Sequence, residues 1–266
     1  GLMRVAFFDS FTGEYLSHDF VASTGGYIHA PYGDVDIVVY NIDAGETHIR
    51  NDYSWNYMEA YTYEISEHQR SRFTRYLQSR VDSRPSYDDI RLTPDHLYVA
   101  RERNIHIPRH ITDEVLIIRT TAKSVVESWN IEVDGVVGME WIASVSMMIS
   151  GQASSHFVAL NQDSEIPIAL YFDVVSAQRR NTVLYTGFET FGRERTSGES
   201  AILSILFTDV QGHPYMYNFD VSDQMDNNPE QKIYIKADIN IPKPEVGGGF
   251  KPEVDDWNEN IYNIEI

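Results

Sequence analysis

The chain has 266 residues, 42% of them hydrophobic, a formal net charge of −19 at pH 7 and no cysteine. This hydrophobic content excludes a disordered chain, and the lack of cysteine excludes disulfides, zinc–thiolate sites, iron–sulfur clusters and cysteine nucleophiles. Because so acidic a chain repels phosphate groups, we expect no nucleic-acid partner.

The first forty residues predict a β-meander. Short runs of β-branched and aromatic residues lie at residues 4–8, 15–21 and 27–30, and turns containing Gly, Asp or Pro separate them. The run at residues 35–41 is almost continuously apolar, so we expect it in the centre of a sheet. Regularly spaced short strands of this kind are typical of a β-sandwich.

An aromatic cluster follows at residues 53–63. In a β-protein such a cluster is more often a half-buried strand face than a ligand platform. The alternative stays open that some of these rings stack on the sugar rings of a ligand. The candidate stacking residues are Tyr53, Trp55 and Tyr57, followed in the same cluster by Tyr61 and Tyr63.

The first helical signals appear between residues 64 and 100. Apolar spacing predicts a short helix at residues 64–80. Thr93, Pro94 and Asp95 predict a second helix start, with Thr as the N-cap and Pro in the first turn, so that residues 96–100 form one helical turn. Pro108 then interrupts a strand-like stretch. We therefore place a domain boundary there, which gives an N-terminal β-sandwich over residues 1–110 and a C-terminal one over residues 111–266.

Strand patterns restart after this boundary, and the predicted fold class is all-β with two tandem β-sandwich domains. A hairpin turn is predicted at residues 209–212, and short helical turns are predicted at residues 136–142 and 222–224. The predicted strands lie at residues 115–121, 125–133, 143–150, 166–174, 181–188, 202–208 and 215–221.

The tail of the chain predicts two further strands. Apolar side chains alternate at residues 233–239, which would place one face of the strand in a core. After two prolines and three consecutive glycines, a second alternating run ends the chain. Its residues Ile261, Ile264 and Ile266 could form a donor strand that completes the sheet of another subunit, although an edge strand within the same chain is the more common arrangement.

Motifs for catalysis or cofactor binding are not found. His106 and His110 have the spacing of two metal ligands on a helix, but Pro108 disfavours that helix. The oxygen-rich residues at 220–230 lack the spacing of a calcium loop. Ser154, Ser155 and His156 lie outside any nucleophile elbow, and adjacent strand residues face opposite ways. We therefore expect no enzyme activity, no catalytic residue, no metal and no cofactor.

Five stretches of the chain resemble a Bacteroides-type surface-lipoprotein family known as domain of unknown function 5119. The most specific is the tail motif at residues 247–257, which runs from the three glycines through Phe250 and Pro252 to Trp257. The other four are residues 25–41 (Gly-Gly-Tyr-Ile, Pro-Tyr-Gly and Ile-Val-Val-Tyr-Asn), 59–62, 92–97 and 219–224. The resemblance therefore spans nearly the whole chain.

This resemblance implies a fimbrillin-like fold of two transthyretin-like β-sandwiches. It also implies a non-enzymatic protein that is exported and held at the outer membrane or cell surface by a lipidated cysteine, which the sequence lacks. The implied role is a fimbria-like adhesin, anchor or accessory subunit with other fimbrial subunits as partners. The alternative is a surface lipoprotein that binds a glycan or host ligand. In either case, the sequence begins so abruptly that we expect a native leader to precede it.

Overall fold

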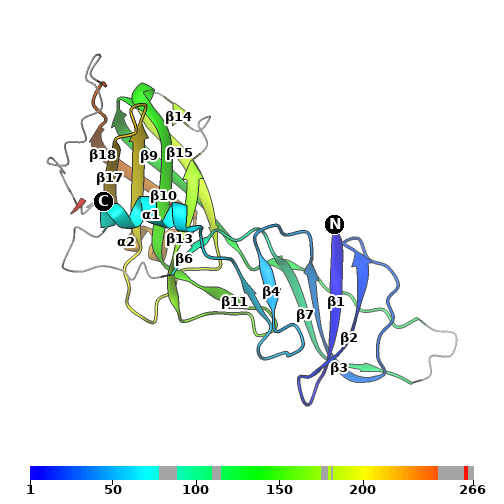
Figure 1. Cartoon of the computed structure of the whole chain (residues 1–266). Coiled ribbons are helices and arrows are strands. Elements are labelled where there is room, and N and C mark those ends of the chain that lie inside the picture. The colour runs from blue at the N-terminus through cyan, green and yellow to red at the C-terminus, as the bar shows by residue number, and fades with distance from the viewer. Residues whose placement is uncertain (78–88, 110–114, 175–178, 181, 245–260, 263–266) are drawn as a thin grey trace. The chain divides into compact units, whose positions relative to one another are not determined.

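The computed structural model describes residues 1–77, 89–109, 115–174, 179–180, 182–244 and 261–262 (Figure 1). It is 54% strand and 7% helix, which confirms the all-β prediction. Contacts group the chain into two compact units, each built from three segments. Unit 1 comprises Gly1–Tyr63, Pro94–Glu127 and Ala153–Ser164, and unit 2 comprises Glu64–Thr93, Ser128–Gln152 and Glu165–Ile266.

This grouping differs from a single boundary at residue 110, and strand pairing explains the difference. In unit 1, β11 (Ser155–Phe157) pairs with β5 (Glu59–Tyr61), although almost one hundred residues separate them. In unit 2, β6 (Ile90–Leu92) pairs in parallel with β13 (Pro167–Val174). Each pairing joins an early segment to a late one, so neither unit is continuous in sequence.

Unit 1 contains two antiparallel sheets. The first has the order β2-β1-β3-β7-β8, with β3 in the central position predicted for its apolar run. One face of this sheet carries a buried cluster that includes Phe7 and Ile37. The second sheet has the order β12-β11-β5-β4. The remaining strands of unit 1 are β1 (Leu2–Asp9), β2 (Tyr15–Ala22), β3 (Gly33–Asn41), β4 (His48–Arg50), β7 (Tyr98–Ile107), β8 (Lys123–Ser124) and β12 (Gln162–Asp163).

Unit 2 is a sandwich of a six-stranded sheet, β19-β17-β16-β10-β13-β6, and a four-stranded sheet, β14-β15-β9-β18. Its main core mixes buried residues of both sheets, such as Phe207, Phe172 and Ile235. The strands not yet given are β9 (Glu127–Val137), β10 (Ile142–Ala153), β14 (Arg179–Arg180), β15 (Val183–Thr190), β16 (Ile202–Asp209), β17 (Pro214–Asp220), β18 (Lys232–Asn240) and β19 (Ile261–Tyr262).

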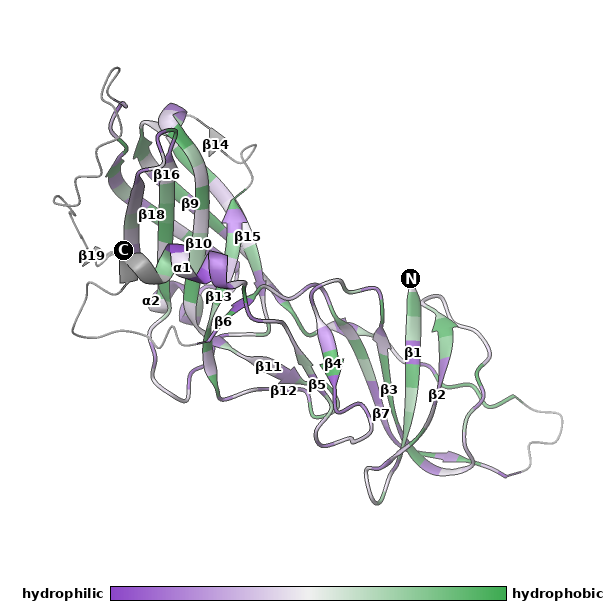
Figure 2. Cartoon of the chain, viewed as in Figure 1, coloured by the Kyte–Doolittle hydropathy of each residue, from purple (hydrophilic) through white to green (hydrophobic). Residues whose placement is uncertain are grey.

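The helices predicted from local sequence signals form in the structure, with one exception described below. The predicted helix at residues 64–80 forms as α1 (Glu67–Leu77), whose fully buried Phe73 contacts Tyr171 of β13 edge to face at 5.7 Å. Figure 2 shows the hydrophilic colouring of α1 beside the apolar strands of its own unit. Two short helices, η1 (Met139–Trp141) and α2 (Ser222–Asn227), and the β16–β17 hairpin turn also form as predicted.

Strand β18 fulfils the alternating pattern of the tail. Every second residue from Ile233 to Ile239 is buried, the three isoleucines fully, and the residues between them are exposed. The strand runs parallel to β9, and the two backbones approach closely at Gly135. A Cβ atom there would lie 2.2 Å from the Ala237 carbonyl oxygen, and Gly135 has a φ of +93°, so this position requires glycine.

Three local predictions are wrong. Residues 93–97 do not form a helix and lead directly into β7, because Asp95 caps a different segment: its carboxylate accepts the backbone N–H groups of Gly45, at 2.6 Å, and Glu46. Residues 115–121 form no strand, and the side chains of Val115 and Ile117 are more than 60% exposed. Residues 27–30 are also irregular, so apolar or aromatic content alone was not sufficient for strand formation.

Candidate functional site

The three candidate stacking residues do not share a surface. Tyr53 and Tyr57 are 66% and 65% exposed, but Trp55 is only 4% exposed. The indole of Trp55 contacts the fully buried Phe8 edge to face at 5.7 Å, and the guanidinium of Arg103 lies 5.1 Å from its ring. This corrects the prediction for Trp55: it is a core residue of unit 1 and offers no open ring face. A turn between Asn51 and Tyr57 breaks the two-residue period and turns Trp55 inward.

A second aromatic cluster in unit 1 is only partly recognised from the sequence. We call it the aromatic patch and define it as His48 and Arg50 of β4 together with Tyr61 and Tyr63, at and after the end of β5. The ring centroids of His48 lie 5.9 Å from Tyr61 and 4.3 Å from Tyr63, and the two tyrosines meet edge to face at 5.7 Å. His48 and Arg50 are two residues apart, and so are Tyr61 and Tyr63. This spacing on two neighbouring stretches of the chain is the sequence signal that could have predicted the patch.

Charge within the patch is balanced. The Arg50 guanidinium lies 4.8 Å from the centre of the Tyr61 ring and pairs with the buried Glu59 carboxylate, with 2.6 Å between Nε and Oε2. Glu59 also accepts a hydrogen bond from the Ser155 hydroxyl. A hydrogen bond with Tyr63 raises the pKa of Tyr61, so its phenol is neutral at physiological pH. The patch therefore presents aromatic rings and polar groups, and the charge of its arginine is balanced by Glu59 beside it.

The tail of the chain returns to unit 2. Ile261 lies in β19, which pairs in parallel with β17, with Ile261 opposite Asn218 and Tyr262 opposite Phe219. The other two candidate donor-strand residues, Ile264 and Ile266, lie outside the described residues, as does the tail motif at residues 247–257. At the β17 end of the six-stranded sheet, the described part of the tail thus adds a parallel strand beside Asn218 and Phe219.

The β18 end of the four-stranded sheet is covered by side chains of α2. The Gln224 amide accepts the Tyr234 backbone N–H at 2.7 Å and donates to the Tyr234 carbonyl at 3.1 Å. Asn228, which follows α2, donates to the Lys232 carbonyl at 2.6 Å. Backbone groups at the end of a sheet otherwise provide a template for another strand. Gln224 therefore takes the place that a neighbouring strand would occupy at Tyr234.

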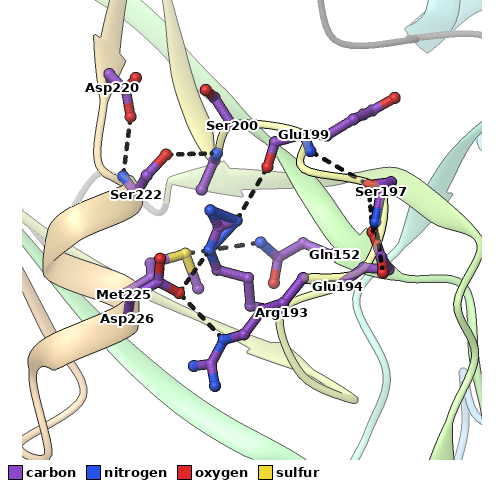
Figure 3. A network of polar contacts seen from close by, with 12 residues as sticks. Gln152, Arg193, Glu194, Ser197, Glu199, Ser200, Asp220, Ser222, Met225 and Asp226 are labelled. Carbon is purple, nitrogen blue, oxygen red and sulfur yellow. Dashed lines mark hydrogen bonds and ion pairs between the residues drawn. The ribbon is translucent and has the colours of Figure 1, made fainter.

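A polar network holds α2 in this position (Figure 3). Arg193, which follows β15, donates to the Asp226 carboxylate of α2 at 2.9 Å and to the Glu199 carbonyl at 3.2 Å. Gln152 donates to the Met225 sulfur at 3.6 Å, and the Ser222 hydroxyl accepts the Ala201 N–H at 2.9 Å. These contacts fix the helix from several directions, so that Gln224 is directed toward β18.

Glu194 anchors the loop that follows Arg193. Its buried carboxylate accepts hydrogen bonds from the hydroxyl and backbone N–H groups of Thr196 and Ser197. Burial by itself would raise the pKa of Glu194, but the hydrogen bonds from Ser197 and Thr196 outweigh it, and the pKa is lowered. The charged form of this side chain therefore stabilises the loop beside α2.

Polar residues considered for metal binding or catalysis have other contacts. His156 shares a 2.6 Å hydrogen bond with Asp163, Ser155 binds Glu59, and Asp226 pairs with arginines, while His110 lies outside the described residues. In the described ranges, no group of three or more His, Asp or Glu side chains could hold a metal ion. The same ranges contain no helix that is long and apolar enough to span a membrane.

Together these features define a class of protein: an all-β chain of two compact units, with sheet edges and exposed aromatic side chains as its candidate interaction surfaces. Residues 2–173 match the family described as Domain of unknown function (DUF5119), and the chain belongs to this family. The resemblance seen in the sequence is thereby confirmed.

Similar proteins come from Bacteroides ovatus. One, described as a candidate fimbrium anchoring subunit, Fim4B, is 23% identical over 280 residues, which cover 93% of this chain and 79% of that protein. A crystal structure described as a candidate adhesin has a TM-score of 0.66 and 21% identity, covering 92% of this chain and 87% of that one. A second candidate adhesin has a TM-score of 0.52 and 10% identity, covering 88% and 80%. These structures share the fold of the present chain.

Proposed function

We propose that the chain is a non-enzymatic, fimbria-associated surface protein that serves as an anchor, adhesin or accessory subunit. The main support is the similarity over 93% of the chain to a protein described as a fimbrium anchoring subunit. The fold shared with two candidate adhesins agrees with this role. Its partners would be other fimbrial subunits.

Strand addition is the proposed basis of assembly. An extended segment of one subunit can join a sheet of another through backbone hydrogen bonds, which require no particular side chain. The β17 edge is the proposed acceptor, because among the described residues it pairs with β19 only at Asn218 and Phe219. An extended segment of another subunit would add along this edge in place of β19, and each backbone hydrogen bond that it makes would contribute about 0.5–1.5 kcal/mol net. The same tail, including Ile264 and Ile266, would then be available as a donor.

The proposed location is the cell surface, reached by export. A lipid anchor in the outer membrane belongs to the same proposal. Since the sequence contains no cysteine, a lipidated cysteine would have to lie outside it.

Crosslinking in the native cells tests this function. The full-length protein is crosslinked on intact cells and purified, and its partners are identified by mass spectrometry. We expect fimbrial subunits in a ladder of sizes. Recovery of the protein alone, or only with glycan transporters of the outer membrane, would overturn the fimbrial role.

A deletion of residues 260–266 tests the donor-strand role of the tail separately from the fimbrial role. The shortened protein should keep its cooperative unfolding transition and lose any polymer, because most of unit 2 remains intact. A variant that fails to fold would overturn the donor-strand role of Ile261, Ile264 and Ile266 without affecting the crosslinking result.

Binding of a glycan or host ligand is the second candidate function. Tyr53 and Tyr57 remain exposed, but without Trp55 they no longer form the platform predicted from the sequence. The aromatic patch is a better-supported location because its rings lie within 6 Å of one another.

A further inference from the structure

The aromatic patch is an exposed surface of unit 1 that goes beyond the fimbrial role. Tyr63 is 54% exposed, and the Arg50 side chain is 48% exposed. Tyr61 and His48 lie half-buried between them. Single exposed aromatic residues are common on proteins, whereas a cluster of three rings and a guanidinium in mutual contact is a distinctive feature.

Rigidity favours a role in recognition. Each tyrosine contributes a large ring with only two rotatable side-chain bonds, so it loses little entropy when a ligand covers it. The contacts within the patch restrict the rings further: Arg50 lies over Tyr61, and His48 packs on Tyr63. Cross-strand pairing of His48 with Tyr61 fixes both rings to the backbone of the second sheet of unit 1. The surface is thus formed before any ligand binds.

The chemistry of the patch selects a type of ligand. Aromatic ring faces attract the apolar C–H faces of a flat or ring-shaped molecule, and the polar tips of Tyr, His and Arg can bond to hydroxyl groups around its rim. Pyranose sugars combine these two features. Nucleobases could also stack on these rings, but a chain with a net charge of −19 repels the phosphates that would accompany them.

Charge selects further among sugars. Arg50 is the cation nearest to the tyrosine rings in the patch contacts, and its charge is balanced by Glu59 at 2.6 Å. The patch thus holds no uncompensated cation for a sialic or uronic acid, and the acidic chain repels both. We propose that the aromatic patch, formed by His48, Arg50, Tyr61 and Tyr63, binds an uncharged pyranose residue of a glycan.

A set of immobilised sugars tests this inference on the full chain. The probes are polyacrylamide-linked galactose, glucose, mannose, fucose, N-acetylglucosamine and N-acetylgalactosamine, with sialyllactose as the anionic comparison, and binding is measured by biolayer interferometry. We expect binding to at least one neutral probe. Tyr63→Ala should weaken this binding by about tenfold or more, as truncation of an interface anchor commonly does. Tyr63→Phe should retain most of it, because the ring face is kept.

Tyr57→Ala is the matched control, since Tyr57 is a similarly exposed tyrosine of the same unit outside the patch. It should bind as the unaltered chain does. Equal losses for Tyr57→Ala and Tyr63→Ala, no binding to any neutral probe, or binding to sialyllactose alone would each overturn the inference.

Nitration provides a measurement that needs no variant. The unaltered chain is treated with tetranitromethane, and nitrated tyrosines are counted by mass spectrometry. A free neutral sugar at saturating concentration should protect Tyr63 and leave Tyr57 reactive. Equal reactivity of Tyr63 with and without each of the neutral sugars would contradict the inference, even if Tyr63→Ala failed to fold. Neither experiment depends on fimbrial assembly, so failure here leaves the crosslinking test unaffected.

Discussion

Strand β18 of unit 2 and the aromatic segment at residues 53–57 of unit 1 look alike in sequence but differ in structure. Both place large side chains at every second position. In β18 this period sets burial, and all the alternate apolar residues enter the core. In the aromatic segment Tyr53 and Tyr57 face solvent, while Trp55 is buried. The two-residue period therefore predicts a shared face only where the backbone is a regular strand.

The largest expected effect is at Trp55. Trp55→Ala should lower the free energy of unfolding by about 3–5 kcal/mol, because it leaves a cavity beside Phe8 and removes the ring beneath Arg103. Tyr53→Ala and Tyr57→Ala should change it by less than about 0.5 kcal/mol. Urea unfolding followed by fluorescence measures all three. An unchanged unfolding midpoint for Trp55→Ala would show that Trp55 is not a core residue in solution.

A smaller pair of changes tests β18. Ile235→Ala should cost about 2–5 kcal/mol, because Ile235 is fully buried in the core of unit 2. Lys236→Ala, at the next position, should stay within about 0.5 kcal/mol, since that side chain is exposed. The same urea titration applies. Similar costs for the two neighbours would show that β18 does not alternate in solution.

The covering of β18 by Gln224 gives a third, more subtle test. Gln224→Ala removes two hydrogen bonds to Tyr234 and should cost about 1–2 kcal/mol. Its main effect should be a concentration-dependent dimer, because the freed backbone groups can pair with another strand. Sedimentation velocity measures this association. Asn227→Ala, an exposed change on the same helix, should remain as monomeric as the unaltered chain. Identical sedimentation of both variants would rule out a protective role for Gln224.

The smallest effect concerns pH and Glu194. Because the pKa of Glu194 is lowered in the folded protein from its ordinary value of 4.5, its stabilising contribution is present above that value and is lost as the pH falls through the folded pKa. Stability of the unaltered chain should therefore decline on acidification more steeply than that of Glu194→Gln. Thermal unfolding at a series of pH values measures the two slopes. Glu165→Gln, an exposed change, should keep the slope of the unaltered chain.

Sequence reasoning succeeded where local pattern decides structure. The central place of β3, the alternation of β18 and the turns at η1 and α2 all follow from short-range signals. It failed where a partner is distant. Asp95 has the chemistry of a helix cap, but it binds the backbone of Gly45, fifty residues earlier. A local signal states what a side chain can bond to, and only the fold determines which partner is present.

The candidate surfaces show the same division. Tyr61 and Tyr63 are visible in the sequence as part of an aromatic cluster, but His48 and Arg50 join them only through the pairing of β4 with β5. The contact of Gln224 with Tyr234 likewise depends on α2 folding back across β18. The exposure of each aromatic side chain could not be predicted either, because residue type does not distinguish a buried Trp55 from an exposed Tyr57.

The interleaving of the two units affects the order in which the chain can fold. Unit 1 lacks β11 and β12 until Ser164 has emerged from the ribosome or the export channel, by which point two of the three segments of unit 2 have already appeared. The edge of β5 that pairs with β11 would therefore wait for its partner while segments of unit 2 pass by. No single cut in the chain would separate the two units, because Glu64–Thr93 and Ser128–Gln152 of unit 2 lie between segments of unit 1.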